Sequence, residues 1–206
     1  MTTNIGISLG WNCYSAMWGV NNNIRDRKEN GYNTCPFDIM VTNYPGICEC
    51  INDDFKYLCD EKYLEIIKHG DCENETVVYN NKYNFSFNHE GPGVANLYIT
   101  ENWEHGRDHF IINNFQYLKE RYQQRTNNFV KYLSDPNNTI TFIITTWDKT
   151  ESDMHVLKDI LKIKYPDLKY NFVILNDPNP NGKECVIKHL KMMRFTENDE
   201  ELKRLL

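Results

Sequence analysis

The second half of the chain alternates between helical and strand patterns. Apolar residues recur at helical spacing over 113–133, and an almost uninterrupted apolar run follows at 139–145. A second helical pattern begins near Ser152, and a second buried strand is expected at 170–175. Helices that alternate with short buried strands predict parallel β–α units joined by crossover connections.

The N-terminal run over residues 4–9 supplies a third buried strand, which ends at Gly10. We therefore predict an α/β fold, a small three-layer sheet with parallel strands at 4–9, 139–145 and 170–175, flanked by helices. The 206 residues suffice for a single domain over 1–206. An Asn-rich turn between two alternating stretches predicts a β-hairpin insertion at about 76–90.

Three shorter helices are expected in the first half of the chain. One follows Cys13, and a second begins near Asn43, with Pro45 in its first turn and apolar residues at helical spacing after it. A third short helix is expected at 61–68.

The charge and the cysteine content of the chain limit the binding partners and the cellular location that the sequence predicts. The net charge is −6, and Lys and Arg are scattered, so the sequence predicts neither a nucleic-acid surface nor a membrane-binding patch. No apolar run approaches the ~18 residues that a membrane-spanning helix needs. Seven cysteines without an export signal predict reduced thiols and a cytoplasmic location.

Cys13 follows the Gly10 turn by three residues, at the start of a predicted helix. Helix N–H groups and the positive end of the helix dipole favour a thiolate there, as a cysteine nucleophile requires. The ends of parallel strands meet at one edge, so Trp147, Asp148 and Asn176 are expected near Cys13. The alternative is a small buried cysteine at a helix start.

Several short motifs resemble a family of uncharacterised proteins described as “putative papain-like cysteine peptidases”. They are Ser8-Leu9-Gly10-x-x-Cys13-x-x-Ala16, Pro36-Phe37-Asp38, Asn88-His89 after the hairpin, and an Arg-containing helix before the strand at 139–145. The chain departs from the family pattern at Ile39, where Trp is usual, and at Glu90, where a second ring is common. A papain-like α+β fold is the alternative that this resemblance implies.

The resemblance implies a cysteine-dependent hydrolase, a peptidase or an acyl- or thioester hydrolase, that uses Cys13 with His89. An imidazole takes the thiol proton and later protonates the leaving group, and Asp38 or Asp148 would orient it. Asn12 is the candidate oxyanion donor. Ser8, Trp147 and Asn88 are further candidates for substrate contacts.

Competing interpretations stay open at this point. Asp38 can equally cap a turn, and the Arg121–Arg125 pair is expected on a solvated helix face. Neither a cofactor nor a metal is predicted, because Cys48, Cys50, Cys59, His69 and Cys72 lack the paired spacing of zinc sites. The substrate is a peptide, an ester or a glycan. The alternative functions are a sugar- or ester-acting enzyme that uses Ser8 or Asp148, and a non-catalytic binding protein.

Overall fold

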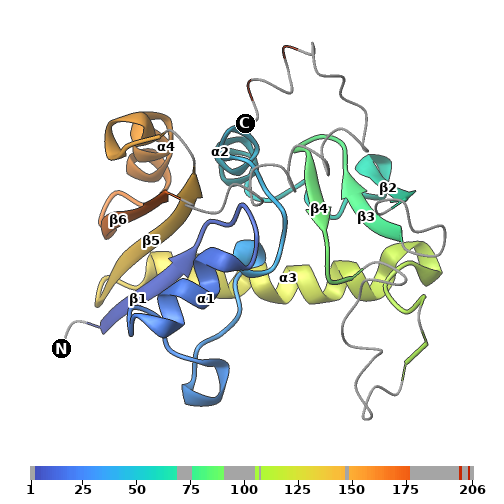
Figure 1. Ribbon diagram of the computed structural model, residues 1–206, viewed down its shortest axis with the longest axis horizontal. Coiled ribbons are helices and arrows are strands. Elements are labelled where there is room, and N and C mark those ends of the chain that lie inside the picture. The colour runs from blue at the N-terminus through green and yellow to red at the C-terminus, as the bar shows by residue number, and fades with distance from the viewer. Residues whose placement is uncertain are drawn as a thin grey trace.

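The chain folds into a mixed α/β structure with two separate sheets (Figure 1). The computed structural model describes residues 3–68, 76–90, 105–106, 108–146 and 149–176, together with residues 200 and 204. Within these ranges one sheet is parallel and the other antiparallel. The predicted α/β class is confirmed.

The parallel sheet contains the three strands expected from the sequence. They are β1 (Thr3–Ser8), β5 (Asn138–Thr146) and β6 (Lys169–Asn176), in the order β1-β5-β6. Ser8 pairs with Ile143, and Thr146 pairs with Asn176. The carboxyl ends of the strands therefore lie at one edge of the sheet, where β1 leads into α1 (Tyr14–Asn21).

Helices flank this sheet. Helix α1 packs so closely on one face that a Cβ atom at Gly19 would lie 2.5 Å from Cδ1 of Ile143. Helix α4 (His155–Lys164) lies toward the other face, where Lys158 Nζ is 5.6 Å from the ring centre of Phe172. The predicted helix over 113–133 is α3 (Ile112–Ser134).

The antiparallel sheet corrects one prediction. Its strands are β2 (Leu64–Lys68), β3 (Thr76–Asn80) and β4 (Phe85–Phe87). The predicted hairpin is present as β3 and β4, but the helix expected at 61–68 is wrong. A short 3-10 turn over Glu61–Tyr63 leads into β2, where Ile66 and Ile67 pair with Val78 and Val77. Pairing between β-branched side chains outweighs the local helical pattern there.

Helix α2 (Tyr44–Asn52) begins as the sequence predicts. The Asn43 side chain accepts a hydrogen bond of 2.7 Å from the Gly46 N–H, and Pro45 occupies the first turn. Asn43 Nδ2 also donates to the carbonyl of Tyr83, so this N-cap ties α2 to the turn between β3 and β4.

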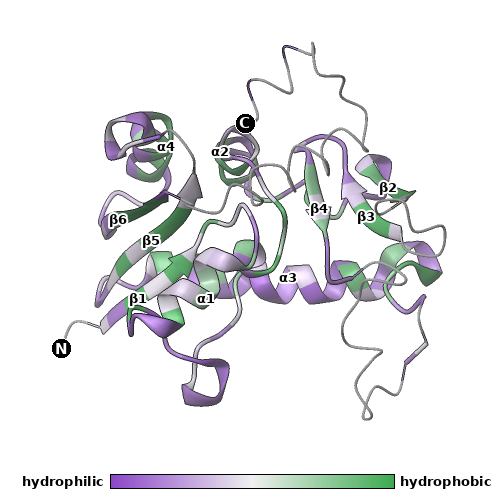
Figure 2. Cartoon of the chain, in the orientation of Figure 1, coloured by the Kyte–Doolittle hydropathy of each residue, from purple (hydrophilic) through white to green (hydrophobic). Residues whose placement is uncertain are grey.

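One apolar core contains side chains from both sheets and from the helices. The ring of Phe37 lies about 6 Å from the rings of Phe55, Phe85 and Phe129, at 5.9, 5.9 and 6.0 Å between centroids. The middle of strand β5 is hydrophobic, and both of its ends are more polar (Figure 2). The core thus fixes β1, β5 and α3 around the residues that form the candidate site.

Across the described ranges, none of the helices is long and apolar enough to cross a membrane.

Candidate active site

The turn after β1 is held in one conformation by hydroxyl groups. Gly10 has φ of +84°, and a Cβ atom there would lie 2.3 Å from Thr42 Oγ1. The Gly10 N–H donates to Ser8 Oγ over 3.0 Å. Ser8 is fully buried, and this bond gives it a structural role. Its burial argues against Ser8 as the nucleophile of an ester-acting enzyme.

A second set of hydroxyl contacts ties the start of α1 to the sheet. Ser15 Oγ donates to the Gly10 carbonyl at 2.8 Å and lies 2.6 Å from Thr145 Oγ1. The Trp11 N–H donates to Thr42 Oγ1 over 3.0 Å. Cys13, between these contacts, therefore has a fixed position at the carboxyl edge of β1 and β5.

Cys13 is the N-cap residue of α1 and is half-buried. Burial raises the pKa of its thiol, and a hydrogen bond from a backbone N–H only partly opposes this. Desolvation thus acts against the thiolate that the position of Cys13 at the helix start favours. Beside it, Asn12 Oδ1 accepts a hydrogen bond of 2.7 Å from the Tyr14 N–H.

A cavity of about 390 Å³ opens beside Cys13, within the size range of small-molecule sites. Helix α1 forms one wall, and the segment from Asn21 to Glu29 forms another. Asp38 and Ile39 complete the lining. The structure thus brings two of the predicted site residues, Cys13 and Asp38, to one cavity.

Asp38 is wholly buried and its carboxylate is engaged by several donors. Arg25 Nη1 donates over 2.9 Å, the Cys35 N–H over 2.8 Å and the Tyr32 hydroxyl over 3.2 Å. The bond from the Cys35 N–H caps the 3-10 turn Pro36–Asp38. Burial raises the pKa of Asp38, and the Arg25 charge opposes that rise. This arrangement supports the structural interpretation of Asp38.

His89 and Asn88 lie in the turn after β4, and both are half-buried. Burial lowers the pKa of His89, which the Glu90 carboxylate partly opposes and Arg125 and Arg121 reinforce. The imidazole is therefore neutral near pH 7 and competent to accept a proton. The charges that act on His89 lie on Glu90 and α3, whereas Cys13 shares its cavity with Arg25 and Asp38.

Two predicted site residues, Trp147 and Asp148, lie outside the described residues, directly after the end of β5. His69 and Cys72, two of the weighed zinc ligands, lie outside them as well. The other three weighed zinc ligands are Cys48, Cys50 and Cys59. Cys48 and Cys50 are buried, and burial raises the pKa of Cys48 to about 11.

A second buried charge cluster was not predicted from the sequence. Glu90 is buried between two arginines of α3: Arg125 Nη1 and Arg121 Nε each lie 3.0 Å from its Oε1. The hydroxyl of Tyr122 donates to Oε2 over 3.2 Å. The expectation of a solvated Arg121–Arg125 face is thus wrong for Arg125, which is 5% exposed.

The helical spacing of apolar residues in the sequence of α3 could have identified Arg125 as a buried residue. Leu118, Tyr122, Phe129 and Leu133 are buried on one face, and position 125 falls on that same face. A charged residue on an apolar face requires a buried partner, which here is Glu90.

The comparison with known families agrees with the motifs. The family described as “Putative papain-like cysteine peptidase” matches residues 5–178 of this chain. The chain belongs to this family. The match includes Cys13, Asp38 and His89, the whole antiparallel sheet, and the parallel sheet apart from Thr3 and Asn4 of β1. No curated protein and no solved structure matches the chain significantly.

Proposed function

We propose that this protein is a cysteine-dependent hydrolase in which Cys13 is the nucleophile and His89 the general base. The observation that carries the proposal is the position of Cys13: half-buried, fixed at a strand-to-helix turn, and lining a cavity. Cys35, Cys48 and Cys50, by contrast, are buried in the core. Membership of the family supports the same reaction class.

The directions of the pKa shifts of Cys13 and His89 determine the protonation states from which the proposed reaction starts. Burial raises the pKa of Cys13 and lowers that of His89, so thiol and imidazole are both neutral near pH 7. The thiol proton must then move to the imidazole as Sγ attacks the substrate carbonyl. The resulting imidazolium protonates the leaving alcohol, thiol or amine. Water then hydrolyses the acyl-enzyme and regenerates the thiol.

The negative charge on the carbonyl oxygen needs donors near Cys13. Asn12 uses Oδ1 for the Tyr14 N–H, which leaves its Nδ2 group to donate. A donor aimed at the developing oxyanion contributes a large share of rate enhancement in acyl transfer. Asp38, held by Arg25, Tyr32 and Cys35, shapes the cavity and is not assigned the role of orienting His89.

Alkylation of the native protein with iodoacetamide, mapped by mass spectrometry between pH 6 and pH 10, tests the nucleophile. We expect Cys13 to react before Cys35, Cys48 and Cys50, at a rate that still rises above pH 9.0, the ordinary thiol value, because its pKa is raised. Equal labelling of Cys13 and the buried cysteines would refute the assignment.

A second experiment tests His89 and the acyl-enzyme. Incubation with an activated aryl ester should add one acyl group at Cys13, and Cys13→Ser should abolish that adduct. His89→Asn should slow acylation near pH 7 and leave it nearly unchanged at pH 10, where the thiolate forms without a base. His155→Asn, at an exposed position on α4, is the matched control. Unchanged acylation of His89→Asn at pH 7 would exclude His89 as the base.

A further inference from the structure

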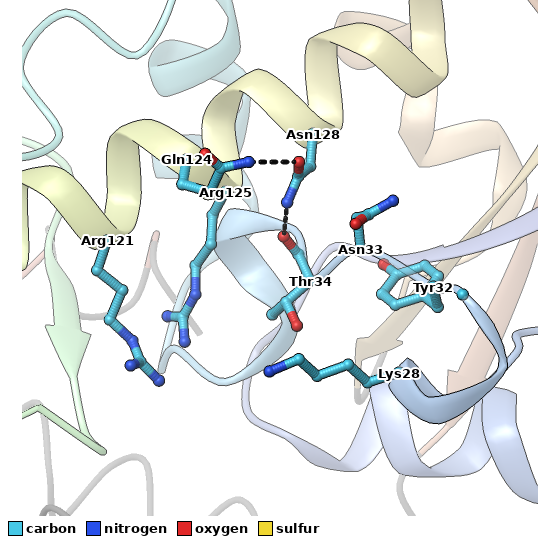
Figure 3. Close-up of a pocket in the computed structure, with 9 residues that line it drawn as sticks. Lys28, Tyr32, Asn33, Thr34, Arg121, Gln124, Arg125 and Asn128 are labelled. Atoms are coloured by element: carbon cyan, nitrogen blue, oxygen red, sulfur yellow. Dashed lines mark hydrogen bonds between the residues drawn. The ribbon is translucent and has the colours of Figure 1, made fainter.

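A second cavity, of about 400 Å³, lies between helix α3 and the segment 28–34. Figure 3 shows that its lining is polar and that the charged ends of Lys28, Arg121 and Arg125 point into the same space. The other labelled lining residues are Tyr32, Asn33, Thr34, Gln124 and Asn128. Lys28 also lines the cavity beside Cys13, so the two cavities adjoin.

The cavity carries an excess of positive charge. Arg121 and Arg125 share one carboxylate, that of Glu90, and approach the same oxygen. Lys28 has no ion pair within the described part of the chain, and no acidic residue is among the described residues that line the cavity. Two guanidinium groups and one ammonium group thus face the cavity, and the buried counter-charges that act on Arg125 from behind it are the carboxylates of Glu90 and Asp38.

The arginines retain donors for a ligand. Arg125 contacts Glu90 through Nη1, and Arg121 approaches it through Nε. The Nη groups of Arg121 have no hydrogen-bond partner in the ranges that the structure describes. Planar guanidinium groups with free N–H donors match the oxygens of phosphate. Burial and the Arg125 charge also lower the pKa of Arg121, a cost that a bound anion would offset.

The neutral side chains present acceptors. Gln124 donates through Nε2 to Asn128 Oδ1, and Asn128 donates through Nδ2 to the Thr34 carbonyl. Asn33 Nδ2 is directed at the Tyr132 hydroxyl. Each of these bonds uses one N–H of the amide group and leaves the carbonyl oxygens of Gln124 and Asn33 to accept from a ligand. A ligand that carries hydroxyl groups would supply donors for these acceptors.

An aromatic base is a poor match for the same cavity. The Tyr32 ring is stacked with Tyr132 at 5.7 Å, and the Arg25 guanidinium lies 4.0 Å from its centroid. The contacts with Tyr132 and Arg25 leave little of the Tyr32 ring to stack with a ligand. The volume is also far larger than a free phosphate needs, so space remains for an attached organic group.

We propose that this cavity binds a phosphorylated sugar or polyol, with the phosphate at Arg121, Arg125 and Lys28 and the hydroxyl groups at Asn33 and Gln124. Binding needs neither Cys13 nor the proposed hydrolysis. The site is therefore distinct from the candidate catalytic residues, although it adjoins their cavity through Lys28.

Isothermal titration of the full-length protein with glucose 6-phosphate, inorganic phosphate, glucose and glucuronate tests the ligand class. We expect glucose 6-phosphate to bind most tightly, inorganic phosphate more weakly, and glucose not measurably. The affinity for glucose 6-phosphate should fall as salt is added, because the contacts are ionic. Glucuronate binding as tightly as glucose 6-phosphate would overturn the assignment to phosphate. Inorganic phosphate binding equally well would overturn the hydroxyl contacts.

Three variants locate the site. Arg121→Gln should weaken glucose 6-phosphate binding by roughly tenfold or more, as expected for a lost charged hydrogen bond, and Lys28→Gln by roughly threefold, because Lys28 is exposed. Lys131→Gln, an exposed position on the same helix, should bind like the wild type.

Cys13→Ser separates this proposal from the hydrolase, since it should remove acylation and leave binding intact. Wild-type affinity in both Arg121→Gln and Lys28→Gln, or no binding of any phosphorylated sugar at about 10 mM, a level at which even a weak millimolar site fills, would overturn the proposed site.

Discussion

The hydroxyl groups of Ser15 and Thr145 lie 2.6 Å apart, although 130 positions separate them in the chain. This contact joins the first turn of α1 to the end of β5, next to Cys13. We expect Ser15→Ala and Thr145→Val each to destabilise the fold by about 1 kcal/mol, the usual net value of a buried hydrogen bond. The double variant should lose less than the sum of the two, because both remove the same bond. Additive losses in urea unfolding would show that the contact contributes no stability.

Replacing Gly10 tests the geometry of the turn before Cys13. Gly10→Ala forces a Cβ atom to within 2.3 Å of Thr42 Oγ1 at a φ of +84°, so both backbone strain and a steric clash oppose it. We expect a loss of about 2–4 kcal/mol, because a strained backbone and overpacking each cost about 1–3 kcal/mol. Gly31→Ala is the matched control: its φ is +99°, but a Cβ atom there meets nothing within 4 Å. The control should lose only about 1 kcal/mol from strain. Equal losses in thermal unfolding would mean that the contact with Thr42 does not constrain the turn.

The buried carboxylate of Glu90 should depend on Arg125. Arg125→Met leaves Glu90 with Arg121 as its remaining cationic partner, and breaking a buried pair in this way costs about 3–5 kcal/mol. Adding Glu90→Gln removes the carboxylate that has lost its pairing with Arg125, so the double variant should regain part of that loss. Chemical denaturation of the single and double variants measures both values. A double variant less stable than Arg125→Met would show that Glu90 does not need the arginine.

Strong periodicity explains which parts of the fold were predictable. The strands at β1, β5 and β6 and the helix α3 have local patterns long enough to define their type, and their strand ends placed Cys13 at one edge of the sheet. Strand β2 was mistaken for a helix because its pattern is short, and its type depends on pairing with Val77 and Val78 of β3.

The buried charges were harder to predict, because their partners come from distant segments. Arg25 meets Asp38, and Arg125 meets Glu90, across 13 and 35 positions. The capping role of Asp38, by contrast, depends on Cys35 three residues before it and was accessible from the sequence. The pKa directions of Cys13 and His89 follow from burial, which a motif alone does not specify.

The titration of His89 provides a last test, because its pKa is lowered from 6.5 by burial. The folded state therefore releases the imidazole proton more readily than the unfolded chain does. Between the lowered pKa and 6.5 the unfolded chain binds more protons, so the free energy of unfolding rises with pH in that window. The contribution of His89 is complete above pH 6.5 and is lost as pH falls through the window.

His89→Gln has no such proton, so its stability should change less with pH than that of the wild type. Urea unfolding of both proteins at pH 5.5 and pH 8 measures this: the difference at pH 8 gives the cost of the substitution itself. That cost should shrink at pH 5.5, where the wild type has lost part of its advantage. A difference that is the same at both pH values would show that the surroundings of His89 do not favour the neutral imidazole, and the general-base role would lose its electrostatic support.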